Sequence, residues 1–277
     1  MHIHFCNSND KEYQKCLNTF LSPIFLDFQF WYDLNLWDEN YESYSIQENG
    51  EIVANLCLYK TEIVMKGKKM QALQMGAVAT RNDYKGRGYA RTLMQHVLDK
   101  YPNTPMYLYA NNTVLDFYPK FGFTRADEKL PVAEYEINNA ITPIKLNFDD
   151  PLVWQYVKKR VNFSQELDCL NTAGINMFHI HLGYLKEHIY HLPELETIVI
   201  ATNDDELKIW GVFSGREITF AELAAHLPFT GVDEIVFGFM PCWPDLEYEL
   251  IEHETEPKFV RSGCDFSGLK FPELSMT

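Results

Sequence analysis

The fold of this chain is decided by the stretch Lys85-Gly86-Arg87-Gly88-Tyr89-Ala90, which joins an apolar segment at residues 70–80 to an amphipathic one. The apolar segment predicts a strand, and the spacing of the apolar positions that follow predicts a helix. Gly86 and Gly88 let the main chain turn tightly at the joint, and the first N–H groups of a helix have no partner inside it. We therefore expect an anion-binding loop between strand and helix. The apolar positions of one helical face are Ala90, Leu93, Met94, Val97, Leu98 and Tyr101.

This joint resembles the acetyl-CoA signature of the GNAT superfamily of N-acetyltransferases. The core of that signature is Gln/Arg-x-x-Gly-x-Gly/Ala, and this chain has Lys85-x-x-Gly88-x-Ala90 in its place. A lysine in the first position keeps a positive charge that suits a pyrophosphate, but it lacks the bidentate fork of arginine. The departure affects the expected affinity for the coenzyme more than the identity of the loop.

A second signature of the same family follows one more expected strand, at residues 105–110. Residues 111–123 are similar to the pattern Asn-x-x-Ala-x-x-x-Tyr-x-x-x-Gly-Phe, with Val114 at the small position. Four positions of the pattern fall in register: Asn111, Tyr118, Gly122 and Phe123. Two signatures in the family's order make residues 45–137 similar to a GNAT domain.

The resemblance implies which residues bind acetyl-CoA. The main-chain edge at the end of the strand would pair with the pantetheine arm and polarise the thioester, and the loop would hold the pyrophosphate. Arg87 and Arg91 fit a solvated helix face equally well, and Asn111 fits a capping role. The implied coenzyme-binding residues are Val78, Ala79, Thr80, Lys85, Gly86, Arg87, Gly88, Tyr89, Ala90, Arg91 and Asn111.

The resemblance also implies that Tyr118 is the general acid that reprotonates the coenzyme thiolate. An unperturbed phenol titrates near pH 10, so it is protonated at neutral pH and can donate. The alternative is a core tyrosine on the same face as Val114 and Phe121. No general base is assigned from the sequence. The candidates are Asp27, Asp33, Glu62, Glu134 and the carboxylate of Thr277, since some tandem enzymes of the family use their C-terminus in this way.

The N-terminal segment predicts two short helices, at residues 11–21 and 25–33. The second is dense in aromatic side chains, and five rings exceed what one helix face can bury. By the resemblance this segment shapes the acceptor site, so we expect some of the rings to line a pocket. Farther along, the Asn49-Gly50 pair predicts a tight hairpin. The five rings are Phe25, Phe28, Phe30, Trp31 and Tyr32.

The second half of the chain predicts another domain. At 277 residues the chain is long enough for two domains, on a prior of about 150 residues each. Asp150 and Pro151 suit the N-cap and first position of a helix. Strand, helix and strand recur beyond them. The joint at residues 212–217, however, has no Gly-x-Gly and carries an acid, so it should not bind CoA.

We therefore expect an α+β fold in two domains. Residues 1–140 would form the acetyl-CoA-binding GNAT domain, a mixed, mostly antiparallel sheet flanked by helices, and residues 141–277 a degenerate GNAT-like repeat without the CoA loop. Helices are expected in that repeat at 152–160 and 218–226, and strands at 175–182, 196–202, 207–213, 234–240, near 247–251 and at 258–264.

The net charge of −15 is concentrated in the second half. Residues 1–142 carry 14 basic and 17 acidic side chains, and the remainder carries 10 and 22. Neither half has the basic footprint that nucleic-acid binding needs. An acidic surface would attract a cationic acceptor, such as a polyamine, an aminosugar or a Lys-bearing peptide. Simple solubility explains the charge equally well.

The sequence predicts no metal site and no membrane segment. Cysteines are scattered without a Cys-x-x-Cys pair, so idle or buried thiols are expected. His179 and His181 share a face of the expected strand, with His188 and His191 downstream, but no cysteine or acid joins them at ligand spacing. No run of about 18 apolar residues occurs, and residues 1–7 lack the features of a signal peptide. The expected location is the cytoplasm.

These observations favour an acetyl-CoA-dependent N-acetyltransferase. The acceptor would be a primary amine of a small cationic molecule or a peptide, attacking acetyl-CoA directly in a ternary complex. A non-catalytic acyl-CoA-binding sensor or scaffold is the alternative from another class, and transfer of a longer acyl group is a further enzymatic one. The sequence does not decide whether the chain forms a homodimer. The acceptor and the acyl-chain preference also stay open, because fold resemblance identifies the donor better than the acceptor.

Overall fold

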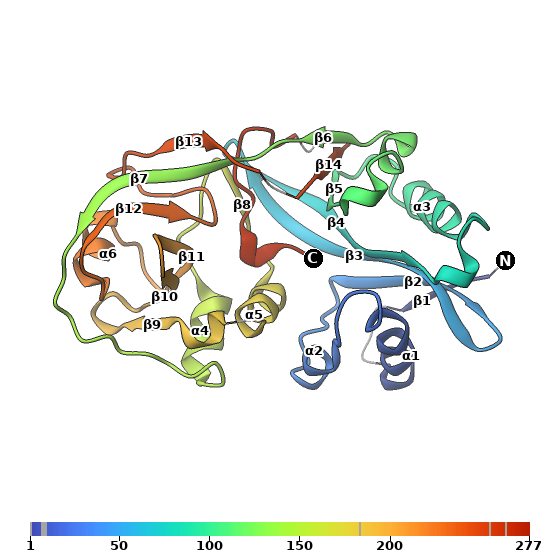
Figure 1. Ribbon diagram of the computed structural model, residues 1–277, viewed down its shortest axis with the longest axis horizontal. Coiled ribbons are helices and arrows are strands. Elements are labelled where there is room, and N and C mark those ends of the chain that lie inside the picture. The colour runs from blue at the N-terminus through green and yellow to red at the C-terminus, as the bar shows by residue number, and fades with distance from the viewer. Residues whose placement is uncertain (1, 7–9, 183, 255, 264) are drawn as a thin grey trace.

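The chain folds around two β-sheets (Figure 1). Within the residues described, the first sheet has eight strands and the second has six. The mixed, mostly antiparallel sheets flanked by helices confirm the α+β class predicted from the sequence. The computed structural model describes residues 2–6, 10–182, 184–254, 256–263 and 265–277.

The first sheet begins as an antiparallel meander with helices on both faces. Successive side chains of β3 point to opposite faces of the sheet, and both faces are apolar. Leu56 and Leu58 pack in one apolar cluster with α3, whereas Cys57 and Tyr59 pack in another with α1. The strand order is β1 (Ile3–Cys6), β2 (Tyr41–Glu48), β3 (Glu51–Met65), β4 (Lys68–Thr80), β5 (Met106–Tyr109), β14 (Lys258–Arg261) and β6 (Thr124–Ala126), with β8 (Leu167–Cys169) on β3. The helices are α1 (Lys11–Leu21), α2 (Gln29–Asp33) and α3 (Tyr89–Lys100).

Two tight hairpins set the register of this meander. Asn49 and Gly50, between β2 and β3, have φ values of 54° and 82°, as a two-residue type I′ turn requires. Lys66 and Gly67, between β3 and β4, have φ values of 50° and 73°. The hairpin predicted at Asn49-Gly50 is confirmed.

The second sheet has a meander of its own, followed by a helix and a parallel strand. Its order is β13 (Glu249–Glu252), β7 (Lys129–Ile137), β12 (Val232–Phe237), β11 (Leu207–Ser214), β10 (Thr197–Asn203) and β9 (Ile189–Leu192). The helices of this half are α4 (Pro151–Lys159), α5 (Ala173–His181) and α6 (Phe220–His226). Asp150 caps α4 by accepting from the N–H of Leu152 at 2.9 Å, which confirms the predicted helix start.

The two sheets exchange one strand each (Figure 1). In the first, β4 and β5 run parallel, and β14 lies antiparallel between β5 and β6. In the second, β11 and β12 run parallel, and β7 lies antiparallel between β12 and β13. The two sheets therefore repeat one topology, as a tandem arrangement requires, and each is completed by the strand that the other half supplies. The division into 1–140 and 141–277 stays a prediction.

Buried charges tie the exchanged strands together. Glu128, just before β7, accepts from Lys258 of β14 at 2.6 Å and from Lys270 at 3.3 Å. Lys270 also pairs with Glu273 at 2.6 Å, and Glu273 pairs with Lys208 of β11 at 2.9 Å. Removing one member would leave an uncompensated buried charge, so this cluster fixes how the two halves meet.

Two expectations about local structure were wrong, those for residues 175–182 and 25–28. Residues 175–181 belong to α5, with Leu182 as its C-cap, and form no strand. Nearly every side of this apolar helix is buried, so no period can be read from the sequence. Residues 25–28 are not helical, and α2 begins at Gln29. The segment around Tyr118 forms short 3₁₀ turns, Asn112–Val114 and Tyr118–Phe121, and no regular helix.

Among the described residues, no helix is long and apolar enough to cross a membrane.

Candidate active site

A cavity of about 890 Å³ opens where β4 and β5 diverge. Its walls come from β4, the loop before α3, the segment after β5, the N-terminal helices and α5. The last residues of the sequence, Met276 and Thr277, also border it. Both halves of the chain therefore build this one site.

A β-bulge in β4 produces the opening. Ala79 lies opposite Asn55 and Gly76 opposite Cys57, so β4 holds one extra residue between the two pairs. Ala77 adopts a φ of 48°, which is rare for a residue with a Cβ, and the Asn55 amide donates to its carbonyl at 3.2 Å.

Beyond the bulge, one edge of β4 has no strand beside it. The parallel pairing of β4 with β5 ends at Met75, opposite Leu108. Val78, Ala79 and Thr80, the predicted partners of the pantetheine arm, follow this point and line the cavity. Unpaired strand edges present main-chain donors and acceptors, so this edge can bind an extended ligand.

The loop that follows leaves the start of α3 open to a ligand. Gly86 and Gly88 have φ values of 78° and 83°, and a Cβ built on either would meet no atom within 4 Å. Gly88 is the N-cap of α3 and has no side chain to occupy the first N–H groups. Lys85, Tyr89, Ala90 and Arg91 line the same part of the cavity. This open cradle fits a phosphate.

Arg87 and Asn111 are engaged with the protein itself. Arg87 does not border the cavity: its Nη2 donates to the Asp83 carbonyl at 3.2 Å, and its guanidinium lies 4.4 Å from the centre of the Tyr84 ring. Asn111 lines the cavity, but its Oδ1 caps the next turn by accepting from the N–H of Thr113 at 2.9 Å. The structure therefore places ten of the eleven predicted coenzyme-binding residues around the cavity, and their binding role stays a prediction.

Tyr118 lines the cavity from the turn after β5. It is 5% exposed and packs against the rings of Phe123 and Phe259, at centroid distances of 6.2 and 5.5 Å. Burial raises the pKa of the phenol to about 12, so the hydroxyl carries its proton at neutral pH. Among the described residues its hydroxyl has no hydrogen-bond partner in the protein, which leaves the proton free to donate.

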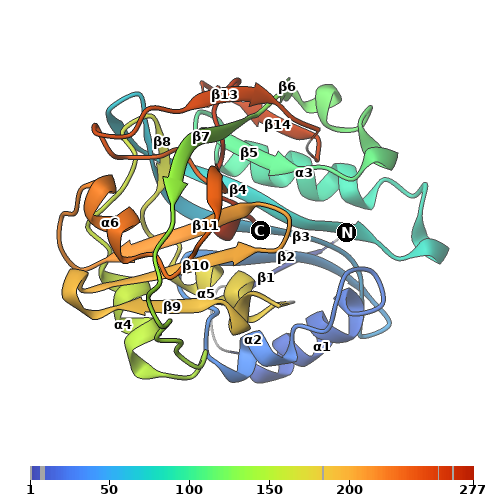
Figure 2. The same ribbon diagram turned by 60° about the vertical axis from the view of Figure 1, so that its left-hand side comes forward.

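Of the five candidate bases, Thr277 alone borders the cavity. Its Oγ1 would lie 3.0 Å from a Cβ placed on Gly76, so only glycine leaves room for the two segments to meet. Figure 2 shows the same C-terminal segment beside the first sheet from a second direction. Asp27, Asp33, Glu62 and Glu134 are absent from the described walls of the cavity.

Side chains from both halves hold the segment 274–277 in place. Asn176 of α5 donates to the Leu274 carbonyl at 2.7 Å, and the ring of His179 donates from Nε2 to the Met276 carbonyl. On the opposite side, the Gln74 amide of β4 donates to the Ser275 carbonyl at 3.0 Å and accepts from the N–H of Thr277 at 2.7 Å. The sequence had no local signal for these three residues, since the tertiary fold alone brings them together.

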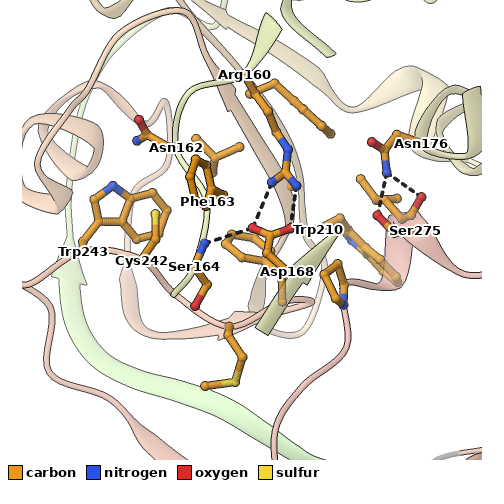
Figure 3. Close-up of a pocket in the computed structure, with 17 residues that line it drawn as sticks. Arg160, Asn162, Phe163, Ser164, Asp168, Asn176, Trp210, Cys242, Trp243 and Ser275 are labelled. Atoms are coloured by element: carbon orange, nitrogen blue, oxygen red, sulfur yellow. Dashed lines mark hydrogen bonds and ion pairs between the residues drawn. The ribbon is translucent and has the colours of Figure 1, made fainter. Parts of the chain in front are cut away.

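The corresponding opening in the second sheet is filled by protein atoms, and Figure 3 shows residues around the small pocket that remains, among them Trp210 and the paired Arg160 and Asp168. A bulge falls at Trp210 of β11, as it does in β4. There, however, a Cβ on Gly211 would lie 2.8 Å from Cδ1 of Leu274, and the N–H of Glu273 donates to the Gly238 carbonyl at 2.8 Å. A cavity of only about 30 Å³ remains beside these residues.

The start of α6 is also closed to anions. Thr219 and Glu222 form a capping box. The carboxylate of Asp245 accepts from the N–H of Phe220 and of Ala221, both at 3.0 Å. The helix start that would face a phosphate is thus already occupied by carboxylates, and the absence of CoA binding in this half stays a prediction.

The histidines do not gather around a metal. His179 and His181 lie on a helix, not on one face of a strand, and His181 stacks on the ring of Phe30 at 4.3 Å. Across the described ranges, no three His, Cys, Asp or Glu side chains meet at a metal-binding distance. Cys6, Cys57 and Cys169 are buried, Cys16 and Cys242 are partly buried, and Cys264 lies outside the described ranges.

Comparisons with known proteins agree with this geometry. Residues 14–126 match the family model of the acetyltransferase (GNAT) domain. Eis1 from Mycobacterium abscessus has a similar structure, with a TM-score of 0.61 and 14% identity over 94% of this chain and 73% of its own. A comparison with curated sequences gives no match.

Two further solved structures are similar over the same share of this chain, 94%. A GCN5-related N-acetyltransferase from Anabaena variabilis ATCC 29413 has a TM-score of 0.59, with 13% identity over 72% of its length. A probable N-acyltransferase of unknown function from Enterococcus faecalis V583 has a TM-score of 0.56, with 14% identity over 73% of its length. At these identities the likeness shows the fold, and it extends over both sheets.

The cradle before α3 predicts a sharp effect of a single side chain. Gly88→Val places a branched side chain at the cradle and costs about 1–2 kcal/mol of backbone strain, so we expect the Kd for CoA in isothermal titration calorimetry to rise at least about tenfold. Gly50→Val is the matched control, since Gly50 has nearly the same φ of 82° and equally open surroundings in a distant hairpin. Equal CoA affinity in the two variants would contradict the assignment.

Proposed function

We propose that this chain, whose residues 14–126 match the family model of the acetyltransferase (GNAT) domain, transfers an acetyl group from acetyl-CoA to a primary amine. The proposed acceptor is a small cationic molecule or a peptide. The observation that carries the proposal is the unpaired edge of β4, which runs directly into the open cradle at the start of α3.

The donor is proposed to lie along this edge in one direction. Its pyrophosphate would occupy the cradle at Gly86 and Gly88, with Lys85 and Arg91 supplying positive charge. The amides of the pantetheine arm would pair with Val78, Ala79 and Thr80, which places the thioester near the bulge at Gly76. Acetyl-CoA supplies the activated acyl group, and the chain positions it.

The reaction we propose is a single displacement in a ternary complex. The neutral amine nitrogen forms a bond to the thioester carbonyl carbon, and main-chain N–H groups at the bulge stabilise the oxyanion. The carbon–sulfur bond then breaks, and Tyr118 donates its proton to the coenzyme thiolate. The nitrogen, which became positively charged when it bonded to carbon, loses one proton to water to give the amide, and the Tyr118 phenolate takes up a proton from water. A phenol with a pKa of about 12 is a neutral donor throughout the physiological range.

An acceptor amine arrives as an ammonium ion and must lose a proton before it can attack. Where Thr277 ends the protein, its α-carboxylate is the candidate base, because Thr277 lies against Gly76 at the proposed position of the thioester. The buried hydrogen bonds from Gln74, Asn176 and His179 would fix its position. With acetyl-CoA as the donor, the location we propose is the cytoplasm.

The role of Tyr118 predicts a selective loss of turnover. Tyr118→Phe should lower kcat about 100-fold, the size of a general-acid contribution, while the Kd for acetyl-CoA changes less than threefold. Release of free thiol at saturating substrates measures the first quantity, and calorimetry the second. Tyr190→Phe, a buried tyrosine of the second sheet, is the control and should leave both unchanged. Undiminished turnover in Tyr118→Phe would remove the role.

The proposed base predicts that the position of the terminal carboxylate matters. Adding Gly-Ser after Thr277 moves this group by two residues, or about 7 Å, and should lower kcat/KM at least tenfold at pH 7. The loss should shrink as the pH rises, because the amine then loses its proton without a base. Unchanged activity in the extended protein would discard the carboxylate as the base. Thiol release that never depends on any amine would favour the sensor alternative instead.

A further inference from the structure

The structure narrows the acceptor, on the basis of the function proposed above. We propose that the acceptor is a monoamine with an apolar, aromatic body, a primary amino group on a short chain attached to a ring. It would not be a polyamine or an aminosugar. The inference rests on the wall of the cavity beyond Gly76, which is opposite in character to the wall around the loop before α3.

The acceptor end of the cavity is identified by the direction of β4. Residues 78–80 lead to the phosphate cradle, so Gly76 lies at the far end, near the thioester. The side chains that line the cavity beyond Gly76 come from the segment between α1 and α2, from α2 itself, from β2 and from α5. An amine must enter from this end to reach the thioester.

Aromatic rings in mutual contact form this end of the cavity. Phe28 stacks on Phe178 of α5, with centroids 5.8 Å apart and planes 12° from parallel. Trp31 lies edge-on to Tyr41, with centroids 4.7 Å apart, and edge-on to Phe178 at 6.3 Å. Together these four rings, which we call the aromatic wall, favour a flat apolar group, because aromatic rings gain by stacking and edge contacts beyond the burial of area.

Apart from the α-carboxylate of Thr277, which is proposed to take up the proton of the reacting amine, the Lys and Arg side chains that border the cavity lie at its other end. Lys85 and Arg91 border the cavity at the loop, and Glu256 is the single acidic side chain among its described walls. Glu256 precedes Pro257, whose carbonyl accepts from the N–H of Ala110, so it belongs to the side of the cavity formed by the segment after β5 and not to the aromatic wall. The histidine at the acceptor end, His179, is kept neutral because burial lowers its pKa.

This distribution discriminates between amines. The reacting amino group is neutralised when it loses its proton, but a second ammonium would be buried against the aromatic wall without a carboxylate side chain to pair with. Burying an unpaired charge is strongly unfavourable, whereas each additional apolar group in such a pocket improves kcat/KM. The acidic surface of the second half therefore does not extend into the described acceptor end.

Two matched pairs of amines test the proposal with the full chain and acetyl-CoA. Hexylamine and 1,6-diaminohexane differ by one terminal amino group, and 2-phenylethylamine and ethylamine differ by one ring. We expect kcat/KM, measured by thiol release, to be at least about tenfold higher for the first member of each pair. Equal or faster reaction of the diamine, or no gain from the ring, would overturn the inference and leave the acetyltransferase function standing.

A variant tests the wall itself. Phe28→Ser should reduce the advantage of 2-phenylethylamine over ethylamine at least about fivefold, and Phe28→Leu should restore part of it. Phe5→Ser, on the exposed edge strand β1, is the control and should leave the ratio unchanged. An unchanged ratio in Phe28→Ser would overturn the role of the wall. If none of these amines reacts while a peptide amine or an aminosugar does, the acceptor inference fails and the acetyltransferase function stands. If no amine of any class reacts while acetyl-CoA still binds, the proposed catalytic function fails as well.

Discussion

The early end of the pairing between β4 and β5 is the constraint on which the rest of this structure depends. The bulge at Ala77 turns β4 away after Met75, and Asn55 holds the strained residue from the neighbouring strand. Because of this divergence, one strand presents an unpaired main-chain edge that leads straight into a helix start with free N–H groups. The loop proposed to bind phosphate, the proposed general acid Tyr118 and the aromatic wall all border the cavity along this edge.

The second sheet has the same topology, but no large cavity opens in it. It has the parallel pair, the bulge and the helix, but residues 272–274 fill the opening, and carboxylates occupy the helix start. The segment that fills this opening continues as residues 275–277 into the first cavity, held by α5 on one side and β4 on the other. The second half therefore has no open cavity of this kind, and its residues form part of the walls of the cavity in the first half.

Local chemistry made much of this visible in the sequence. Gly86 and Gly88 need positive φ, and the Asn49-Gly50 pair specifies a hairpin, so these features are encoded within a few residues. The 175–182 segment was misassigned because a helix buried on nearly every side and a buried strand both appear in the sequence as an apolar run. This helix packs closely: a Cβ on Gly174 would lie 2.9 Å from the Leu36 carbonyl oxygen. The strand exchange could not be predicted from the sequence either, because the pattern of apolar residues in β7 is the same whichever sheet the strand joins. The meeting of Phe28, Phe178 and Thr277 depends on that exchange.

The central claim is that one coenzyme site exists, along β4 and at the start of α3. Amide hydrogen exchange with and without saturating CoA tests it most directly, because it reports on each main-chain N–H separately. The account predicts that CoA slows exchange at residues 76–80 and 86–91 and leaves residues 210–222 unchanged. Protection at 210–222, or no protection at 86–91 while CoA is bound, would contradict it.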